Sequence, residues 1–272
     1  MRATVVGPGR RVARERDDSP SLGRRVLDGI AHVGRLAMFV MDAMRALPEV
    51  RIWWPRMVRE AVSIGAGSLF IVLFIAAFAG AVTALQTGYQ YNAAMPYYYV
   101  GTIVVSMIIL ELGPVLTALI LSGRVGARYA AELGTMRVTE QIDALESLGR
   151  SPASHLIIPR VIAGFIMIPV LTVFADLSGI AAGWLAVKSV LPVSDADFVY
   201  GAQVFYRSFD GYYSIIKSFC FAAAITILPC YMGFNTRQGA EGVGQATTAA
   251  VVSSSVVILL LDVLVAQVLL GK

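Results

Sequence analysis

Five long stretches of the chain are almost entirely apolar, and shorter polar segments separate them. The first stretch lies in a region, residues 61–110, that contains no charged residue. A helix needs about 20 consecutive apolar residues to cross the hydrocarbon core of a membrane. The pattern therefore predicts five membrane-spanning helices, at residues 61–85, 97–121, 161–187, 212–234 and 246–270.

The composition supports this class of protein. Of the 272 residues, 57% are hydrophobic and only 15% are charged, whereas a soluble domain usually carries about 25% charged residues. The net charge of +4 comes mainly from the first 60 residues, so it does not indicate a nucleic-acid partner. The sequence predicts an all-α integral membrane protein.

A compact charged segment, residues 122–160, separates the second span from the third. It holds five Arg, three Glu, one Asp and one His, which predicts a water-exposed loop. Within it, Val138, Ile142 and Leu145 follow the i, i+4, i+7 spacing of one helical face. We therefore expect a short amphipathic helix over residues 136–149 whose apolar face docks on something in the cytoplasm.

A second amphipathic pattern precedes the first span. Apolar residues recur at alternating spacings of four and three over residues 22–47, and Arg and Asp fill the other faces. Such a helix is too charged to span a membrane, so we expect it either to lie in the membrane interface or to pack on a protein partner. Pro48 and Pro55 are expected to break it, and Trp53 and Trp54 to anchor the chain at the interface.

These patterns predict three parts. Residues 1–20 are expected to be a disordered cytoplasmic tail, residues 21–56 an interfacial amphipathic helix with its linker, and residues 57–272 the transmembrane domain. The segments before the first span and between the second and third spans hold 17 Arg. Because cytoplasmic loops are rich in Arg and Lys, the N-terminus is predicted to be cytoplasmic and the C-terminus to lie outside.

Motifs of catalytic chemistry are missing. There is no HExxH zinc motif and no GxxxxGK[ST] phosphate-binding loop, so the chain is not expected to be an enzyme, to hold a metal or to bind ATP itself. The two cysteines, Cys220 and Cys230, lie in an apolar run and are expected to be buried free thiols.

Three carboxylates fall inside predicted spans: Glu111, Asp176 and Asp262. A charge at the centre of a bilayer costs at least ~2.5 kcal/mol, so these side chains must face the protein interior, water or a partner. They fit a substrate or proton pathway, and equally a packed, hydrogen-bonded role. Glu111 also lies just before Pro114, which lacks a backbone N–H, and this favours a part in gating.

Tyrosines crowd the turn between the first two spans, at positions 89, 91, 97, 98 and 99. They fit an aromatic belt at the outer membrane interface. They also fit an opening for an amphipathic ligand.

One long run has a specific resemblance. Residues Glu111 to Pro152, with the sequence ELGPVLTALILSGRVGARYAAELGTMRVTEQIDALESLGRSP, resemble the signature region of the MlaE/YrbE family of ABC-transporter permeases. Residues 159–172 and 242–252 and the pair Leu261–Asp262 are similar to the same family, and the resemblance covers roughly residues 45–270.

The resemblance implies a fold, a function and partners. Members of the MlaE/YrbE family are homodimeric permeases of the bacterial inner membrane, built from an interfacial helix and five spans. They move lipids between that membrane and the outer envelope. They work with a separate cytoplasmic ABC ATPase, which binds ATP and Mg, and with an MCE-domain protein on the periplasmic or extracytoplasmic side.

The resemblance also implies two sets of site residues. The helix between spans two and three becomes a coupling helix in the ATPase groove, with contacts from Arg137, Val138, Glu140, Gln141, Ile142, Asp143, Ala144 and Leu145. The lipid site lies at the dimer interface, near the outer end of span one, and corresponds to Thr83, Gln86, Gln90 and Tyr91.

One departure and two alternatives remain. Many members carry Arg directly before the ELGP motif, where this chain has Leu110, so an ionic role of that Arg beside Glu111 does not carry over. A proton-coupled secondary transporter would use the three carboxylates without an ATPase. A non-transporting membrane anchor of an envelope complex would need neither the three carboxylates nor an ATPase.

Overall fold

The computed structural model describes residues 22–91, 95–189, 191–204, 206–237 and 239–271, without the side chains of residues 22–30 and His32. The predicted tail at residues 1–20 lies outside this range. The chain divides into two units, Met1–Phe39 and Val40–Lys272. The first unit contains most of helix α1 (Leu22–Arg45), and the second contains everything discussed below.

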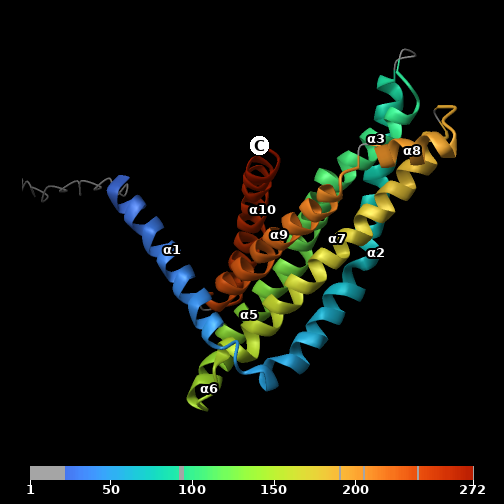
Figure 1. The fold of residues 1–272 in the computed structure, drawn as a ribbon. Coiled ribbons are helices and arrows are strands. Elements are labelled where there is room, and N and C mark those ends of the chain that lie inside the picture. The colour runs from blue at the N-terminus through green and yellow to red at the C-terminus, as the bar shows by residue number, and fades with distance from the viewer. Residues whose placement is uncertain (1–21, 92–94, 190, 205, 238, 272) are drawn as a thin grey trace, which may run out of the picture. The chain divides into compact units, whose positions relative to one another are not determined.

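The described residues form helices joined by short turns, without a strand (Figure 1). Three of the helical elements, labelled η, are short π-helical segments. After α1 the elements are α2 (Val50–Gln90), α3 (Tyr98–Met107), η1 (Ile108–Leu112), α4 (Gly113–Leu121), η2 (Ser122–Gly126), α5 (Ala127–Val138), α6 (Gln141–Ser147), η3 (Ala153–Ile157), α7 (Ile158–Val187), α8 (Asp195–Val204), α9 (Ser208–Phe234) and α10 (Ala240–Leu270).

Five of these helical stretches are long and apolar enough to cross a membrane: 50–90, 98–138, 153–187, 208–234 and 240–270. The prediction of an all-α membrane protein with five spans is confirmed. The first two stretches have 41 residues each and are therefore about 60 Å long at 1.5 Å per residue. That is twice the thickness of the hydrocarbon core, so each extends well beyond it.

Two sequence predictions about helix ends are wrong. Pro55 does not break a helix, because α2 begins at Val50 and runs through it. Pro55 lies only in the second turn, where its missing N–H removes a single hydrogen bond. Nearby, the buried Trp53 donates its Nε1–H to the Leu47 carbonyl at 3.0 Å, which holds the chain at the start of α2.

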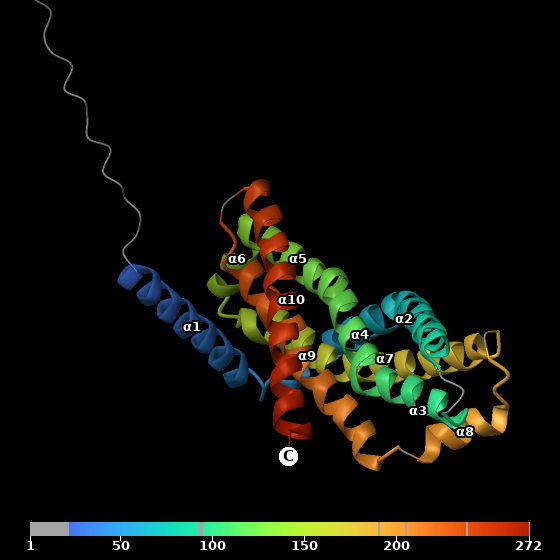
Figure 2. The same cartoon turned by 90° about the horizontal axis from the view of Figure 1, so that it is seen from above.

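The segment 122–160 is also not simply an exposed loop. Its first 17 residues continue the second span as η2 and α5, and Tyr129 and Leu133 are fully buried. Helix α5 packs against α9 and α10, as Figure 2 shows. Charge density alone misled the prediction, because the charged side chains here pair with one another, as described below.

Helices α2 and α7 form the most extensive contact of the fold and run side by side (Figure 1). They cross at Gly80 and Gly179, where a Cβ on Gly80 would overlap the Gly179 carbonyl. Small residues let membrane helices approach closely. The Ser178 hydroxyl adds a bond of 2.9 Å to the Leu73 carbonyl.

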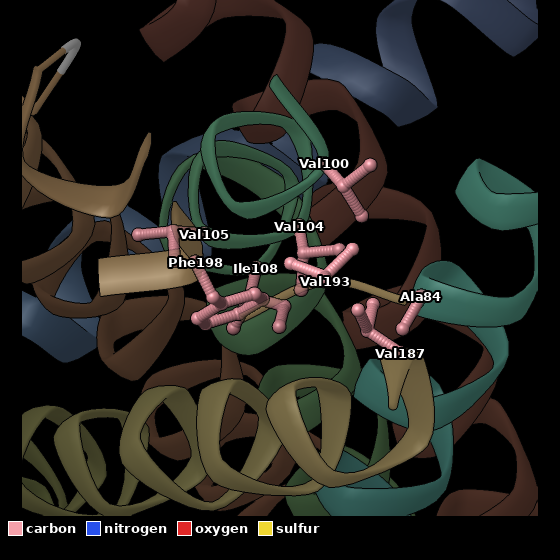
Figure 3. Packing of buried hydrophobic residues seen from close by; sticks show 8 residues of the cluster. All are labelled: Ala84, Val100, Val104, Val105, Ile108, Val187, Val193 and Phe198. Carbon is pink, nitrogen blue, oxygen red and sulfur yellow. The ribbon is translucent and has the colours of Figure 1, made fainter. Parts of the chain in front are cut away.

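An apolar core lies at the end of the bundle where α2 reaches Gln90, here called the Gln90 end. It joins α2, α3, α7 and α8, and Figure 3 shows its eight buried side chains. They are Ala84, Val100, Val104, Val105, Ile108, Val187, Val193 and Phe198. This core fixes α3 against α2, and so shapes the pocket described next.

Candidate functional site

A pocket of about 230 Å³ lies at the Gln90 end, between α2 and α3. All four residues predicted for lipid contact, Thr83, Gln86, Gln90 and Tyr91, line it. The rest of the lining is Thr87, Met95, Tyr99, Val100, Ile103 and Met107. One wall is thus polar and comes from α2, while the other is largely apolar and comes from α3.

The polar side chains of this pocket differ in how far they are already bonded. The Thr83 hydroxyl donates to the Ala79 carbonyl and the Thr87 hydroxyl to the Thr83 carbonyl, each at 2.8 Å. The Tyr91 hydroxyl donates to the Met95 carbonyl at 2.6 Å. Within the described part of the chain, the amides of Gln86 and Gln90 form no hydrogen bond, so they are the groups available to a polar ligand.

A larger apolar groove of about 590 Å³ lies between α3, α7 and α8. Its lining is apolar except near Gln203 and Tyr206. Acyl chains of the surrounding membrane suit such a surface, and it lacks the convergent polar groups that mark a specific site.

Deeper in the bundle, the structure brings two of the three predicted carboxylates together on Lys217 of α9. The Lys217 Nζ lies 2.6 Å from Glu111 Oε2 and 2.5 Å from Asp262 Oδ1. The Lys217 side chain is 0% exposed, Asp262 14% and Glu111 47%. We call these three residues the ion triad, and it ties α9 to η1 and α10.

The backbone around Glu111 explains why the lysine fits there. Pro114 has no N–H to donate to the Leu110 carbonyl four residues earlier, and η1 interrupts the α-helical pattern at this point. The Lys217 Nζ donates to that carbonyl at 3.0 Å. A carbonyl exposed by the proline and two carboxylates thus surround one ammonium group, which is how a charge becomes tolerable at this depth.

Asp176 is buried on α7 and makes a separate contact. The Ser214 hydroxyl, one turn before Lys217 on α9, donates to Asp176 Oδ2 at 2.9 Å. The other carboxyl oxygen lies where a Cβ on Gly113 would be, so only glycine fits at that position. All three intramembrane carboxylates therefore meet α9 within residues 214–217.

The predicted helix over residues 136–149 is shorter than expected. Val138 ends α5, Thr139 and Glu140 form a turn, and α6 covers only Gln141–Ser147. Glu140 has φ of 58°, a left-handed conformation that is costly for a residue with a side chain. Arg137 Nη1 bonds Asp143 Oδ1 across the turn at 2.6 Å. Gly149, with φ of 69°, follows α6 in the left-handed conformation that is common just after the end of a helix.

The prediction that the apolar face of this segment is free to bind a partner is wrong for Ile142. Ile142 was predicted to face a partner, but its side chain is 0% exposed and packs within the chain, because α6 folds back against α5. Leu145 is half-buried and Leu148 is 74% exposed. The exposed side chains of the segment are Thr139, Glu140, Gln141, Asp143, Ala144, Glu146, Ser147 and Leu148.

A charged cluster joins α5 to α2 and α7. Arg128 bonds Glu60 and Arg160 bonds Glu132, each at 2.8 Å. The two guanidinium groups lie 5.2 and 5.5 Å from the ring centre of the buried Tyr129. This charged cluster fixes α5, the helix that precedes α6, to the rest of the bundle.

Comparison with known proteins places this architecture. The family described as Permease MlaE matches residues 57–268. The chain belongs to the MlaE permease family. A probable ABC transporter permease of Rickettsia conorii is 36% identical over 247 residues, which cover 91% of this chain and 95% of that protein.

Two further relatives of this MlaE-family chain carry more specific names. The intermembrane phospholipid transport system permease protein MlaE of Haemophilus influenzae is 34% identical over 92% of this chain and 97% of its own length. The protein TRIGALACTOSYLDIACYLGLYCEROL 1, chloroplastic, of Arabidopsis thaliana is 35% identical over 78% of this chain and 61% of its own length.

Lys217 is the site residue of this MlaE-family permease that sequence reasoning missed. The sequence analysis placed it inside the predicted fourth span, residues 212–234, but gave it no role. The structure places it inside α9, where it is fully buried. A signal was present: Ser214, Lys217 and Ser218 are spaced at three and four residues along an apolar helix, which is a polar stripe facing the interior.

Proposed function

We propose that this chain is the transmembrane permease of an ATP-driven phospholipid transporter of the bacterial inner membrane, and that it works as a homodimer. Family membership and the name of the Haemophilus relative support the substrate class. The observation that carries the proposal is the pocket at the Gln90 end, whose one polar and one apolar wall match the two parts of a lipid.

The positive-inside rule supports an orientation in which the Gln90 end faces outward. The pocket then lies at the level of the outer leaflet, and an MCE-domain protein on that side would exchange lipid with it. The paired tyrosine rings at the turn, Tyr91 and Tyr97, stack with centroids 5.0 Å apart and form a flat apolar rim for acyl chains.

A separate cytoplasmic ABC ATPase, which binds ATP and Mg, would act through α6 and the turn before it. The predicted contacts are Arg137, Val138, Glu140, Gln141, Asp143, Ala144 and Leu145, with the exposed Leu148 added and the buried Ile142 removed. Acids on this surface would pair with basic residues at the edge of a groove and set the register of docking.

A proton-coupled secondary transporter is the second candidate, because the ion triad surrounds one lysine with two carboxylates. Such a protein would transport along a proton gradient without ATP. A membrane anchor would bind its partners and transport nothing.

The test is reconstitution of the full chain with its ATPase in vesicles that contain a fluorescent phospholipid. Transfer is expected to require ATP hydrolysis and to be insensitive to a pH gradient. The double variant Gln86→Leu, Gln90→Leu is expected to lose most transfer, since both free amides of the pocket disappear. Tyr89→Leu is the matched control, because Tyr89 is exposed on the same turn outside the pocket. Transfer that follows a pH gradient without ATP would refute the proposal.

A further inference from the structure

A basic pocket of about 430 Å³ lies at the opposite end of α2 from Gln90. Its lining comes from the first three turns of α2 and from the segment between α6 and α7. The residues are Arg51, Ile52, Pro55, Arg56, Arg59, Arg150 and His155. Two parts of the chain about a hundred residues apart thus place four arginines around one cavity.

These arginines have no counter-charge close at hand. In the part of the chain that the structure describes, none of the four forms an ion pair with a carboxylate. Arg56 Nη1 donates to the Ile52 carbonyl at 3.1 Å, and its other N–H groups remain available. Even when the exposed Glu49, just before α2, is counted, the charge at this end of α2 stays positive. Since guanidinium groups stay protonated, an anion completes the site.

The position of the pocket in the membrane indicates which anion. Trp54, beside the pocket residues on α2, is exposed, as is typical of a side chain at the membrane–water interface. From residue 61 onward α2 is free of charge, so the hydrocarbon core begins about one turn beyond Arg59. The cavity therefore lies at the depth of lipid head groups.

The chemistry of the lining points the same way. Arginine presents parallel N–H donors that match the oxygens of a phosphate, and basic pockets between membrane helices on the cytoplasmic side suit acidic lipid head groups. Ile52 and Pro55 add an apolar side to the cavity, which suits the glycerol and the start of the acyl chains.

We propose that this basic pocket binds the phosphate of an anionic phospholipid from the cytoplasmic leaflet. The lipid is not the transported one, because residues 55 and 86 of α2 are separated by about 46 Å at 1.5 Å per residue. It ties the start of α2 to the segment that follows α6. An inorganic phosphate ion offers related chemistry, and the experiment distinguishes it from a lipid.

The experiment uses the full chain purified in a neutral detergent. Short-chain phosphatidylglycerol and phosphatidylcholine are titrated in parallel, and native mass spectrometry counts bound lipid. We expect phosphatidylglycerol to bind at least tenfold more tightly. The double variant Arg56→Gln, Arg150→Gln is expected to abolish that preference, and Arg237→Gln to keep it. Arg237 is exposed beyond the end of α9 and outside the pocket.

Further arms keep the result decisive. If the double variant does not yield a folded protein, Arg51→Gln and Arg150→Gln are tested singly, and each is expected to reduce the preference severalfold. Millimolar inorganic phosphate is expected not to displace the lipid. An unchanged preference in folded variants, or displacement by inorganic phosphate as effective as by phosphatidylglycerol, would overturn the proposal. Full-strength phosphatidylcholine binding to the same arginines would overturn it as well.

Discussion

Replacing Lys217 with methionine tests whether the ion triad holds the membrane bundle together. Methionine keeps the length and apolar stem of lysine but removes the ammonium group. Glu111 and Asp262 then face each other without a cation, and the Leu110 carbonyl loses its donor. Removal of one partner from a buried ion pair costs about 3–5 kcal/mol, so Lys217→Met is expected to destabilise the folded chain by about that amount.

The exposures of the two carboxylates predict an order among the single variants. Asp262 is 14% exposed and Glu111 47%, so water screens Glu111 more strongly. Asp262→Asn should therefore cost more than Glu111→Gln. A triple variant with Lys217→Met, Glu111→Gln and Asp262→Asn should recover most of the loss, because no uncompensated charge remains. Non-additivity of this kind is the signature of groups that act together.

The assay is denaturant unfolding of the purified chain in lipid nanodiscs, followed by circular dichroism. Lys188→Met is the matched control. Lys188 also lies 2.5 Å from a carboxylate, that of Asp195, but both side chains are well exposed, so its loss should cost about 1 kcal/mol or less. If Lys217→Met and Lys188→Met prove equally mild, the triad contributes no net stability and the reasoning fails.

Three further predictions concern other surfaces. Leu145→Asp should weaken ATPase binding roughly tenfold, because it loses about half of the free energy of burying a leucine side chain, some 1–1.5 kcal/mol. Leu148→Asp should weaken binding at least as much, and a pull-down assay measures both effects. In a chain without Cys220 and Cys230, a cysteine that replaces Ala196 should react with a membrane-impermeant thiol reagent added outside the cell. A cysteine that replaces Leu148 should react only after the membrane is permeabilised, and the reverse pattern would contradict the proposed membrane orientation. Gly80→Val should lower the free energy of unfolding by more than about 2 kcal/mol, because the new side chain meets the backbone of α7. Gly244→Ala, with open space around it, should be neutral in the same unfolding assay.

Much of the fold was accessible from the sequence because long apolar runs have one solution in a membrane. A spanning segment must satisfy its own backbone hydrogen bonds, so each run becomes a helix. Helix ends were harder. The charges of Arg128 and Glu132 predicted a loop, but pairing with Glu60 and Arg160 keeps this stretch helical. Pairing across helices is a tertiary property that no local pattern reports.

The candidate sites were accessible to different degrees. The four residues assigned to lipid contact by resemblance do share one pocket, although their role stays a prediction. The partner of Glu111 was not found, because its 106-residue separation from Lys217 leaves no trace in periodicity. The burial of Ile142 within its own chain was missed for a related reason. An amphipathic pattern shows which face of a helix is apolar, but not whether the same chain or a partner covers that face.

The continuity of one helical stretch gives these separate sites a physical connection. Residues 98–138 begin at the pocket wall, with Tyr99 and Met107, and pass through Glu111 of the triad. They then reach the charged cluster around Arg128 and end at the turn before α6. A force applied at the C-terminal end of α5, next to the turn that carries α6, would therefore reach the pocket without passing through a loop. The stretch departs from regular α-helix at η1 and η2, and π-helical segments often occur at functional positions. At η1, Lys217 donates to the carbonyl that Pro114 leaves without its α-helical donor, so a side chain of α9 supports the helix there in addition to its own backbone. A bond between helices changes when the helices move, whereas a backbone ladder does not. Under the proposed function, the triad is therefore the point at which movement of α6 would alter the angle of α3, and with it the width of the pocket.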